Sequence, residues 1–178
     1  LKTYLNNYLH TTLQLDPRKD NWIYDGIQVY IMMKYIEEFH PDSKMMGSVA
    51  KWRLVRGYNL VSLGFNGQYS YFYMLMARKN LDQPLGESKD KLLKFNEKIA
   101  SKYRAGLSFR YLAEYLGQEI LDQSILEFIA LAQQHNVSTQ DFQRILQKNS
   151  AQNLDWFFNT IINSREIIDY KFSEVTRT

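Results

Sequence analysis

Apolar residues recur every three or four positions along most of the chain, which is the spacing of amphipathic helices. The first two such patterns cover residues 4–13 and 22–36. Further patterns cover residues 67–81, the stretches on both sides of Ser101, residues 118–135, residues 138–147 and residues 153–162. The sequence therefore predicts an all-α, multi-helix domain.

Polar segments with proline, glycine or hydroxyl side chains separate these patterns. Residues 15–21 (LDPRKDN) and 40–43 (HPDS) each contain a proline, which disfavours helix in the residue before it. Residues 82–90 (DQPLGESKD) are the clearest internal loop. Ser138 or Thr139 can cap the helix that follows, because a hydroxyl accepts a hydrogen bond from a free backbone amide.

Two segments are less regular than the rest. Residues 45–63 have helical spacing, but Gly47 and Gly57 interrupt it. The tail, residues 169–178 (DYKFSEVTRT), alternates and carries β-branched residues, which favours a strand. We therefore expect a helical domain over residues 1–168, and a tail that could be the first strand of a following β-domain.

Composition narrows the class of protein. The formal net charge is +3 and no block of five basic residues occurs, so we expect no nucleic-acid partner. Cysteine is absent, which excludes disulfides and thiolate metal sites. No run of eighteen apolar residues predicts a transmembrane helix. The first residue is Leu1, which favours a segment of a longer protein whose other domains would be its partners.

Three short motifs carry a resemblance to a known family. Residues 22–26 (WIYDG) resemble W-L-x-E-G, residues 102–117 (KYRAGLSFRYLAEYLG) resemble Y-x-K-G followed by an apolar helix and Leu-Gly, and residues 154–162 (LDWFFNTII) resemble D-L-x-x-F-F. In this order they are similar to the gluzincin aminopeptidases, zinc metallopeptidases that include aminopeptidase N and leukotriene A4 hydrolase. The resemblance implies the helical later part of a thermolysin-like catalytic domain. It also favours a bacterial protein in the periplasm or outside the cytoplasm.

The resemblance also implies which residues stand at the zinc site. In this family an H-E-x-x-H motif supplies two zinc ligands and the general base, and a glutamate on the next helix is the third ligand. Asp25 stands at the position of that glutamate. Counting back by the family's spacing, without a gap, places Asn6 at the second histidine, Thr3 at the base and Lys2 at the first histidine.

These four residues are unsuited to zinc chemistry. A protonated lysine has no acceptor, and Asn6 offers a neutral amide oxygen. Thr3 cannot act as a base. Asp25 could still bind a metal, but its carboxylate is one methylene shorter than that of glutamate, and one carboxylate alone does not hold zinc. The sequence predicts a degenerate zinc site with no cofactor. Two interpretations of Lys2 stay open. In the first, Lys2 and Asp25 form an ion pair and the ammonium replaces the zinc ion. In the alternative interpretation, Lys2 is solvated and frayed because it lies at the chain end.

Tyr103 matches the family tyrosine whose hydroxyl stabilises the oxyanion of the tetrahedral intermediate. Ala105 stands where the Y-x-K-G motif has its lysine, so the match is partial. The alternative is an interfacial tyrosine with its ring in the core and its hydroxyl in water. The three histidines share no ligand spacing; they are His10, His40 and His135.

Three functions stay open at this point. The first is a non-catalytic, metallopeptidase-like helical module that is structural or binds a peptide or protein. The second is a fragment of an active zinc aminopeptidase whose H-E-x-x-H motif lies upstream of residue 1, in which case zinc is the cofactor. The third is a helical interaction domain of the solenoid type. A cleft shared by Asn6, Asp25 and Tyr103 would distinguish the first two from the third.

Overall fold

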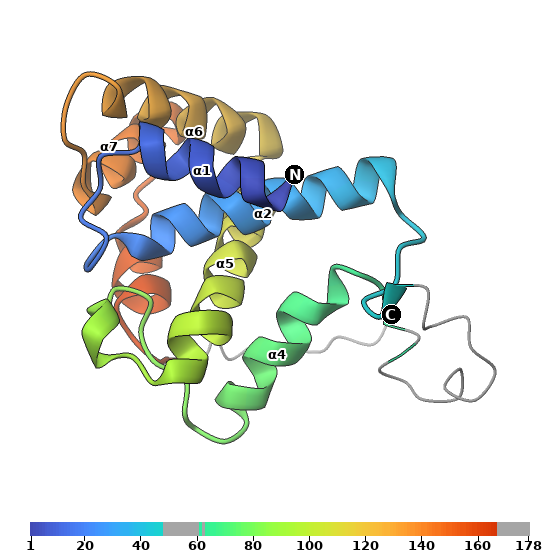
Figure 1. The fold of residues 1–178 in the computed structure, drawn as a ribbon. Coiled ribbons are helices and arrows are strands. Elements are labelled where there is room, and N and C mark those ends of the chain that lie inside the picture. Colours follow the sequence, from blue (N-terminus) through green and yellow to red (C-terminus); the bar gives the residue numbers. More distant parts are fainter. Residues whose placement is uncertain (48–60, 62, 167–178) are drawn as a thin grey trace, which may run out of the picture.

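The computed structural model describes residues 1–47, 61 and 63–166, and it is built from α-helices (Figure 1). Their bounds are α1 (Lys2–Thr12), α2 (Asn21–Phe39), α4 (Gly67–Ala77), α5 (Ser101–Leu116), α6 (Gln118–Ala132) and α7 (Thr139–Ser150). Shorter helical turns are η2 (Lys89–Lys91), η3 (Asn96–Ala100) and η4 (Phe157–Ile162). Within these residues the β-structure is one isolated antiparallel bridge between Lys44 and Gly64. The predicted all-α fold is confirmed.

The predicted helices and turns agree with these bounds to within a few residues. The two patterns on either side of Ser101 correspond to η3, which ends at Ala100, and α5, which begins at Ser101, and the helical backbone continues from one into the other. The irregular segment 45–63 falls largely outside the described residues. The tail, residues 169–178, and the expected domain boundary before it also lie outside the described residues.

Helix α2 is the centre of the fold (Figure 1). It crosses α5 in the largest helix–helix interface of the described residues, and α1 packs along it. Helices α6 and α7 pair with each other on one side, while α4 packs against α5 and η3 on the other. A solenoid would pack each helix pair only on its neighbours along the chain. The α2–α5 interface joins segments far apart in the sequence, so the arrangement differs from the solenoid expectation.

Trp22 explains why the first motif belongs to the core. Its indole is 3% exposed and lies 5.9 Å from the ring of Phe109, 6.3 Å from that of Phe142 and 6.2 Å from that of Phe158, measured between centroids. These partners come from α5, α7 and η4, so one side chain of α2 contacts three other elements. Aromatic pairs at this separation favour tilted and edge-on geometries, which hold neighbouring helices at defined angles.

The N-terminus of α7 has the cap that the sequence predicts. The Ser138 hydroxyl accepts a hydrogen bond from the backbone amide of Asp141, and the Asp141 carboxylate accepts one from the Ser138 amide at 3.0 Å. This reciprocal capping box satisfies two amides that a helix start leaves free. Of the two candidates, Ser138 is therefore the cap residue.

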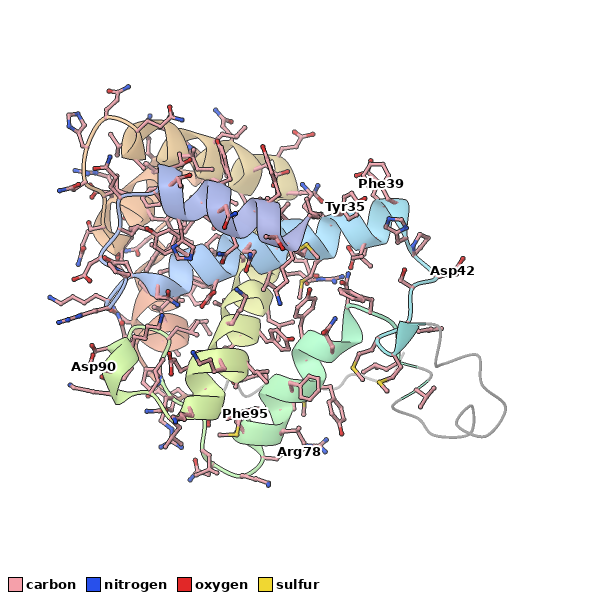
Figure 2. The ribbon with its side chains drawn as sticks, viewed as in Figure 1. Tyr35, Phe39, Asp42, Arg78, Asp90 and Phe95 are labelled. Atoms are coloured by element: carbon pink, nitrogen blue, oxygen red, sulfur yellow. The ribbon has the colours of Figure 1, made fainter. Side chains whose placement is uncertain are left out.

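The C-terminal end of α2 carries an aromatic cluster beyond the main bundle (Figure 2). The ring of Tyr35 lies 5.0 Å from that of Phe39 and 5.4 Å from the imidazole of His40. Phe39 remains mostly exposed. Among the described helices, this one included, none combines the length and apolar character that crossing a lipid bilayer requires.

Candidate functional site

Two glycines let α2 and α5 approach closely. A Cβ atom on Gly26 of α2 would lie 2.3 Å from the ring of Phe109 on α5, and one on Gly106 of α5 would lie 2.1 Å from Val29 on α2. On each helix the glycine and the bulky residue are three positions apart, so each bulky side chain fits over the glycine of the other helix. The last residue of the WIYDG motif therefore has a packing role.

This crossing brings Asp25 of α2 next to Lys102 of α5. The Lys102 ammonium lies 2.9 Å from the Asp25 Oδ1 atom, and both side chains are 18% exposed. Asn21, one turn earlier on α2, donates a hydrogen bond of 2.7 Å to the Oδ2 atom of the same carboxylate. The Lys102 ammonium also donates to the Oε1 atom of Gln28. Both carboxylate oxygens of Asp25 are thus bound by side chains of α2 and α5.

Gln28 connects this ion pair to the start of α1. Its side chain is 3% exposed, and its Nε2 atom donates a hydrogen bond of 3.1 Å to the backbone carbonyl of Lys2. The amide of Gln28 therefore accepts from Lys102 and donates to α1. Three elements that are distant in sequence meet in one hydrogen-bonded network of Lys2, Gln28, Lys102 and Asp25.

The predicted ion pair between Lys2 and Asp25 is wrong. Lys2 is exposed, and within the described residues no carboxylate lies within 4.0 Å of its ammonium. Lys102 lies beside Asp25 because α5 crosses α2 at this point. The side chain of Lys2, in the first turn of α1, is exposed to solvent. Lys2 meets the network through its backbone carbonyl, so the alternative of a solvated side chain describes Lys2 correctly.

The remaining predicted positions on α1 lie apart from the network. Thr3 and Asn6 are both exposed, and neither side chain makes a hydrogen bond within the described residues. Lys2 and Asn6 nevertheless share a helix face with the buried Leu9 and Leu13, because these residues follow one another at spacings of three and four. The leucines of this face pack on the bundle, whereas the side chains of Lys2 and Asn6 are exposed.

Tyr103 neighbours Lys102 in sequence but belongs to a different set of contacts. Its hydroxyl donates a 3.4 Å hydrogen bond to the Oε1 atom of Gln68 on α4, and its ring packs edge-on against Tyr69 at 4.9 Å. Burial raises the pKa of Tyr103. Tyr103 therefore joins α5 to α4, and the structure does not bring it together with Asn6 and Asp25 in one cleft.

The tyrosines between α4 and α5 predict a loss of stability in alkali. Burial, and to a lesser degree the neighbouring Tyr103, raises the pKa of Tyr69 to about 12 from its ordinary 10.0. Below pH 10 the Tyr69 phenol is protonated in both the folded and the unfolded state. Between pH 10 and 12 only the unfolded state readily loses this proton, so the folded state becomes less stable relative to it. We expect the free energy of unfolding to fall by on the order of 1 kcal/mol per pH unit in that range. In Tyr69→Phe this part of the slope should be absent, measured by urea denaturation at each pH.

The donor set around Asp25 does not fit a zinc ion. Zinc sites use combinations of thiolate, imidazole and carboxylate ligands. Within the residues that the structure describes, no group of three such side chains is close enough to hold a metal. The imidazole of His10 stacks on the ring of Tyr24, with 4.5 Å between the ring centroids. Within the described residues, the cationic side chain that pairs with Asp25 is Lys102.

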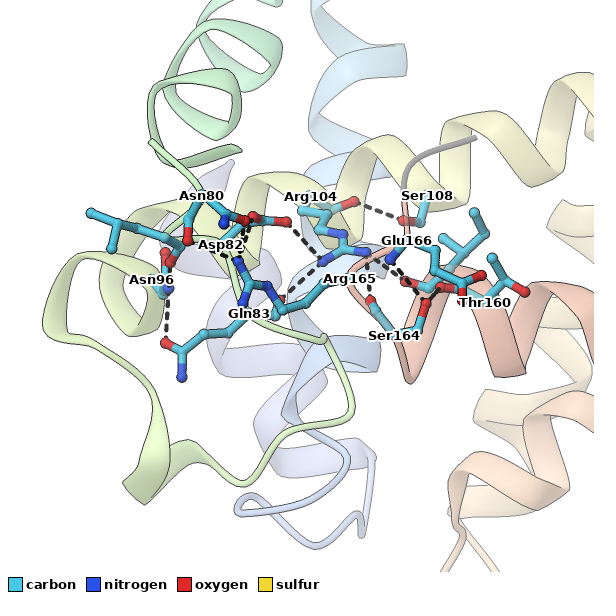
Figure 3. Close-up of polar contacts among 12 residues, drawn as sticks. Asn80, Asp82, Gln83, Asn96, Arg104, Ser108, Thr160, Ser164, Arg165 and Glu166 are labelled. Atoms are coloured by element: carbon cyan, nitrogen blue, oxygen red, sulfur yellow. Dashed lines mark hydrogen bonds and ion pairs between the residues drawn. The ribbon is translucent and has the colours of Figure 1, made fainter. Parts of the chain in front are cut away.

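A second buried cation, Arg104, was missed by sequence reasoning (Figure 3). Its guanidinium donates 3.0 Å hydrogen bonds to the backbone carbonyls of Gln83, Ile161 and Ser164, and it lies 3.7 Å from the Asp82 carboxylate. Arg104 therefore ties α5 to the loop after α4 and to the segment that contains η4. The sequence signal was a single arginine in a run of small and apolar residues on α5, which does not identify its partners.

Replacing Arg104 with lysine should loosen this junction. A lysine keeps the charge but has a point-like ammonium, which cannot reach three carbonyls from the fixed fork of a guanidinium. We expect Arg104→Lys to lower the free energy of unfolding by about 1.5 kcal/mol. We also expect faster amide hydrogen exchange in residues 157–164. Arg165→Lys is the matched control, because Arg165 is 44% exposed and its hydrogen bonds among the described residues go to Asn80 alone, so it does not join three segments as Arg104 does. Equal exchange in the two variants would contradict the assignment.

Comparisons of this chain with models of protein families, with curated proteins and with solved structures found no match. The geometry of the described residues, together with the motifs in the sequence, is therefore the basis for a functional proposal.

Proposed function

We propose that this chain is a non-catalytic, metallopeptidase-like helical module, in which the Lys102 ammonium takes the place of the zinc ion of gluzincin aminopeptidases. The observation that carries this proposal is the 2.9 Å ion pair between Lys102 and Asp25, the residue that resembles the third zinc ligand. An ammonium at this distance neutralises the carboxylate and repels a divalent cation. On this proposal the module is a scaffold or a peptide-binding part of a larger protein, and it does not hydrolyse peptides.

The position of α1 supports the register on which the proposal depends. The register puts Lys2 and Asn6 where the family has its two histidines, four positions apart on one helix. Gln28, one turn after Asp25 on α2, donates to the backbone of Lys2, so this end of α1 lies beside the Asp25 helix. Side chains at Lys2 and Asn6 lie four positions apart and so share one face of α1, as two ligands of one metal would need to.

The proposal is tested by rebuilding the zinc site. The variant carries Lys2→His, Thr3→Glu, Asn6→His, Asp25→Glu and Lys102→Ala. It is dialysed with zinc, the excess is removed, and bound metal is counted alongside the thermal midpoint. A control variant has the same four changes on α1 and α2 and keeps Lys102. Circular dichroism checks that all three proteins fold.

We expect no retained zinc in the unaltered chain, close to one zinc per chain in the rebuilt variant, and weaker retention when Lys102 is kept. About one zinc in the unaltered chain would overturn the proposal, because its own residues would then hold the metal. About one zinc in a longer parent protein, and none in the unaltered chain, would favour the fragment of an active aminopeptidase. A folded, rebuilt variant without zinc would mean that the register between α1 and Asp25 is wrong.

A further inference from the structure

A cleft of about 910 Å³ opens beside the N-terminal end of α2, on the side of α7. Its walls come from residues 14–16, 19, 20 and 22, residues 86–88, residues 136–140 and Asn163. This volume is in the range of small-molecule and peptide-side-chain sites. The Asp25 and Lys102 side chains are not among its walls, so it is separate from the network described above. We call it the Trp22 cleft, after the buried indole that forms part of its floor.

Hydrogen bonds between the walls hold the Trp22 cleft open. The Val137 amide donates to the carbonyl of Gln14 at 3.3 Å, and the Thr139 hydroxyl donates to the Asp20 carboxylate at 2.6 Å. On the other side, the amide of Gly86 donates to the carbonyl of Ile162 at 2.9 Å. Because each wall is fixed to a different helix or loop, the cleft is formed before any ligand arrives.

The ionisable side chains of the cleft are mostly acidic. The lining contains three carboxylates, those of Asp16, Asp20 and Glu87, and one ammonium, that of Lys19, so three negative charges minus one positive charge leave a charge of −2 among the lining residues. The whole chain has the opposite sign, with a net charge of +3. A cation is therefore attracted to this cleft by local groups and not by the overall charge of the protein.

Each of these carboxylates has one oxygen to spare. The Oδ1 atom of Asp16 accepts from the Arg18 amide at 2.9 Å, and the Oε1 atom of Glu87 accepts from the Ser88 amide at 3.1 Å and lies 3.6 Å from the Lys91 ammonium. Within the described residues, the second oxygen of each carboxylate accepts no hydrogen bond. The Oδ1 atom of Asp20 accepts from both the amide and the hydroxyl of Thr139, so Asp20 also holds the start of α7 in place.

The floor and the rim of the cleft suit a ligand that is partly apolar. Leu15, Trp22 and Val137 form a buried apolar floor. Side-chain amides, which both donate and accept hydrogen bonds, stand around it. These amides belong to Gln14, Asn136, Gln140 and Asn163. An alkyl chain can lie on such a floor while its charged end reaches a carboxylate at the rim.

We propose that the Trp22 cleft binds an ammonium or guanidinium group carried on an alkyl chain, as in a lysine or arginine side chain of an extended peptide or in a free polyamine. The apolar floor takes the alkyl chain, and the spare oxygens of Asp16 and Glu87 take the cationic group. The inference goes beyond the proposed function and does not depend on it, because it uses none of the zinc-site positions.

The test uses labelled decapeptides and fluorescence anisotropy with the full chain. One peptide contains alternating lysines, a second has the same lysines acetylated, and a third has glutamates in their place. Spermidine, added as a competitor, distinguishes a free polyamine from a peptide side chain. The test variant combines Asp16→Asn with Glu87→Gln. The matched control combines Glu38→Gln with Glu119→Gln, which removes two charges from exposed positions on α2 and α6.

We expect the lysine peptide to bind at least tenfold more tightly than the acetylated peptide, and the glutamate peptide not to bind. Asp16→Asn with Glu87→Gln should weaken the lysine peptide about tenfold, and the control should leave it unchanged. Displacement by spermidine at concentrations equal to the peptide's Kd would identify a polyamine as the ligand. Equal affinity for the lysine and acetylated peptides, or an unchanged affinity in the test variant, would overturn the inference. The zinc count of the rebuilt variant is unaffected by either result, so the two proposals fail separately.

Discussion

Gly106→Ala should destabilise the folded chain by about 3 kcal/mol, because overpacking at a close helix crossing forces the helices apart. A methyl group there would lie 2.1 Å from the Cγ1 atom of Val29, and the β-branched valine has little freedom to move away on a helix. In a helix interior, alanine is otherwise favoured over glycine by about 1 kcal/mol. The expected loss of about 3 kcal/mol is therefore the cost of overpacking minus this gain in helix propensity. Urea denaturation followed by circular dichroism measures it.

The control for this prediction is Gly64→Ala, because a Cβ atom at Gly64 has no other atom within 4 Å. It should change the free energy of unfolding by less than about 0.5 kcal/mol. A compensating pair sharpens the test, since Val29→Ala makes room for the new methyl group. The double variant of Val29→Ala and Gly106→Ala should recover part of the loss. If Gly106→Ala is as stable as Gly64→Ala, the α2–α5 crossing is not as close as described.

Lys102→Met should destabilise the chain by about 2 kcal/mol, because it leaves the Asp25 carboxylate without its cation in a mostly buried position. Methionine fills nearly the same volume, so the loss reports charge and hydrogen bonding more than packing. The residual exposure of 18% for each side chain keeps the expected value below that of a fully buried pair. Thermal or urea unfolding measures the change.

A second substitution separates the ion pair from general damage. Asp25→Asn combined with Lys102→Met removes both charges, and we expect this double variant to be more stable than Lys102→Met alone. Lys148→Met is the matched control, since Lys148 forms an exposed pair with Glu127 at 2.7 Å and should cost less than about 1 kcal/mol. A loss in Lys102→Met no greater than in Lys148→Met would mean that the Asp25–Lys102 pair contributes little.

The predictions for Gly106→Ala and Lys102→Met concern the same crossing of α2 and α5. Gly26 stands next to Asp25 on α2, and Gly106 stands one turn after Lys102 on α5. The close approach at the glycines is what places the ammonium within 2.9 Å of the carboxylate. We therefore expect Gly106→Ala to weaken the ion pair as well as the packing. In Gly106→Ala the further cost of Lys102→Met should be smaller than in the unaltered chain, which a double-mutant cycle measures.

The sequence by itself determined the local features of this protein. Periodic apolar residues predicted the helices, prolines and polar runs predicted the turns between them, and Ser138 was one of two predicted caps. Each of these depends on residues within one or two helical turns of one another. The pattern over residues 22–36 also placed Trp22, Asp25 and Gly26 on one helix, although the packing role of Gly26 was not visible in the sequence.

The tertiary structure alone decided the partners of the charged side chains. Lys102, not Lys2, pairs with Asp25 because the α2–α5 crossing brings residues 77 positions apart into contact. The same holds for Arg104, whose carbonyl partners lie in two distant segments, and for Tyr103, whose hydroxyl points to α4. Helical spacing says which face a residue occupies. Which element covers this face depends on how side chains from distant segments pack together. The residues within one or two turns of a helix do not determine that packing.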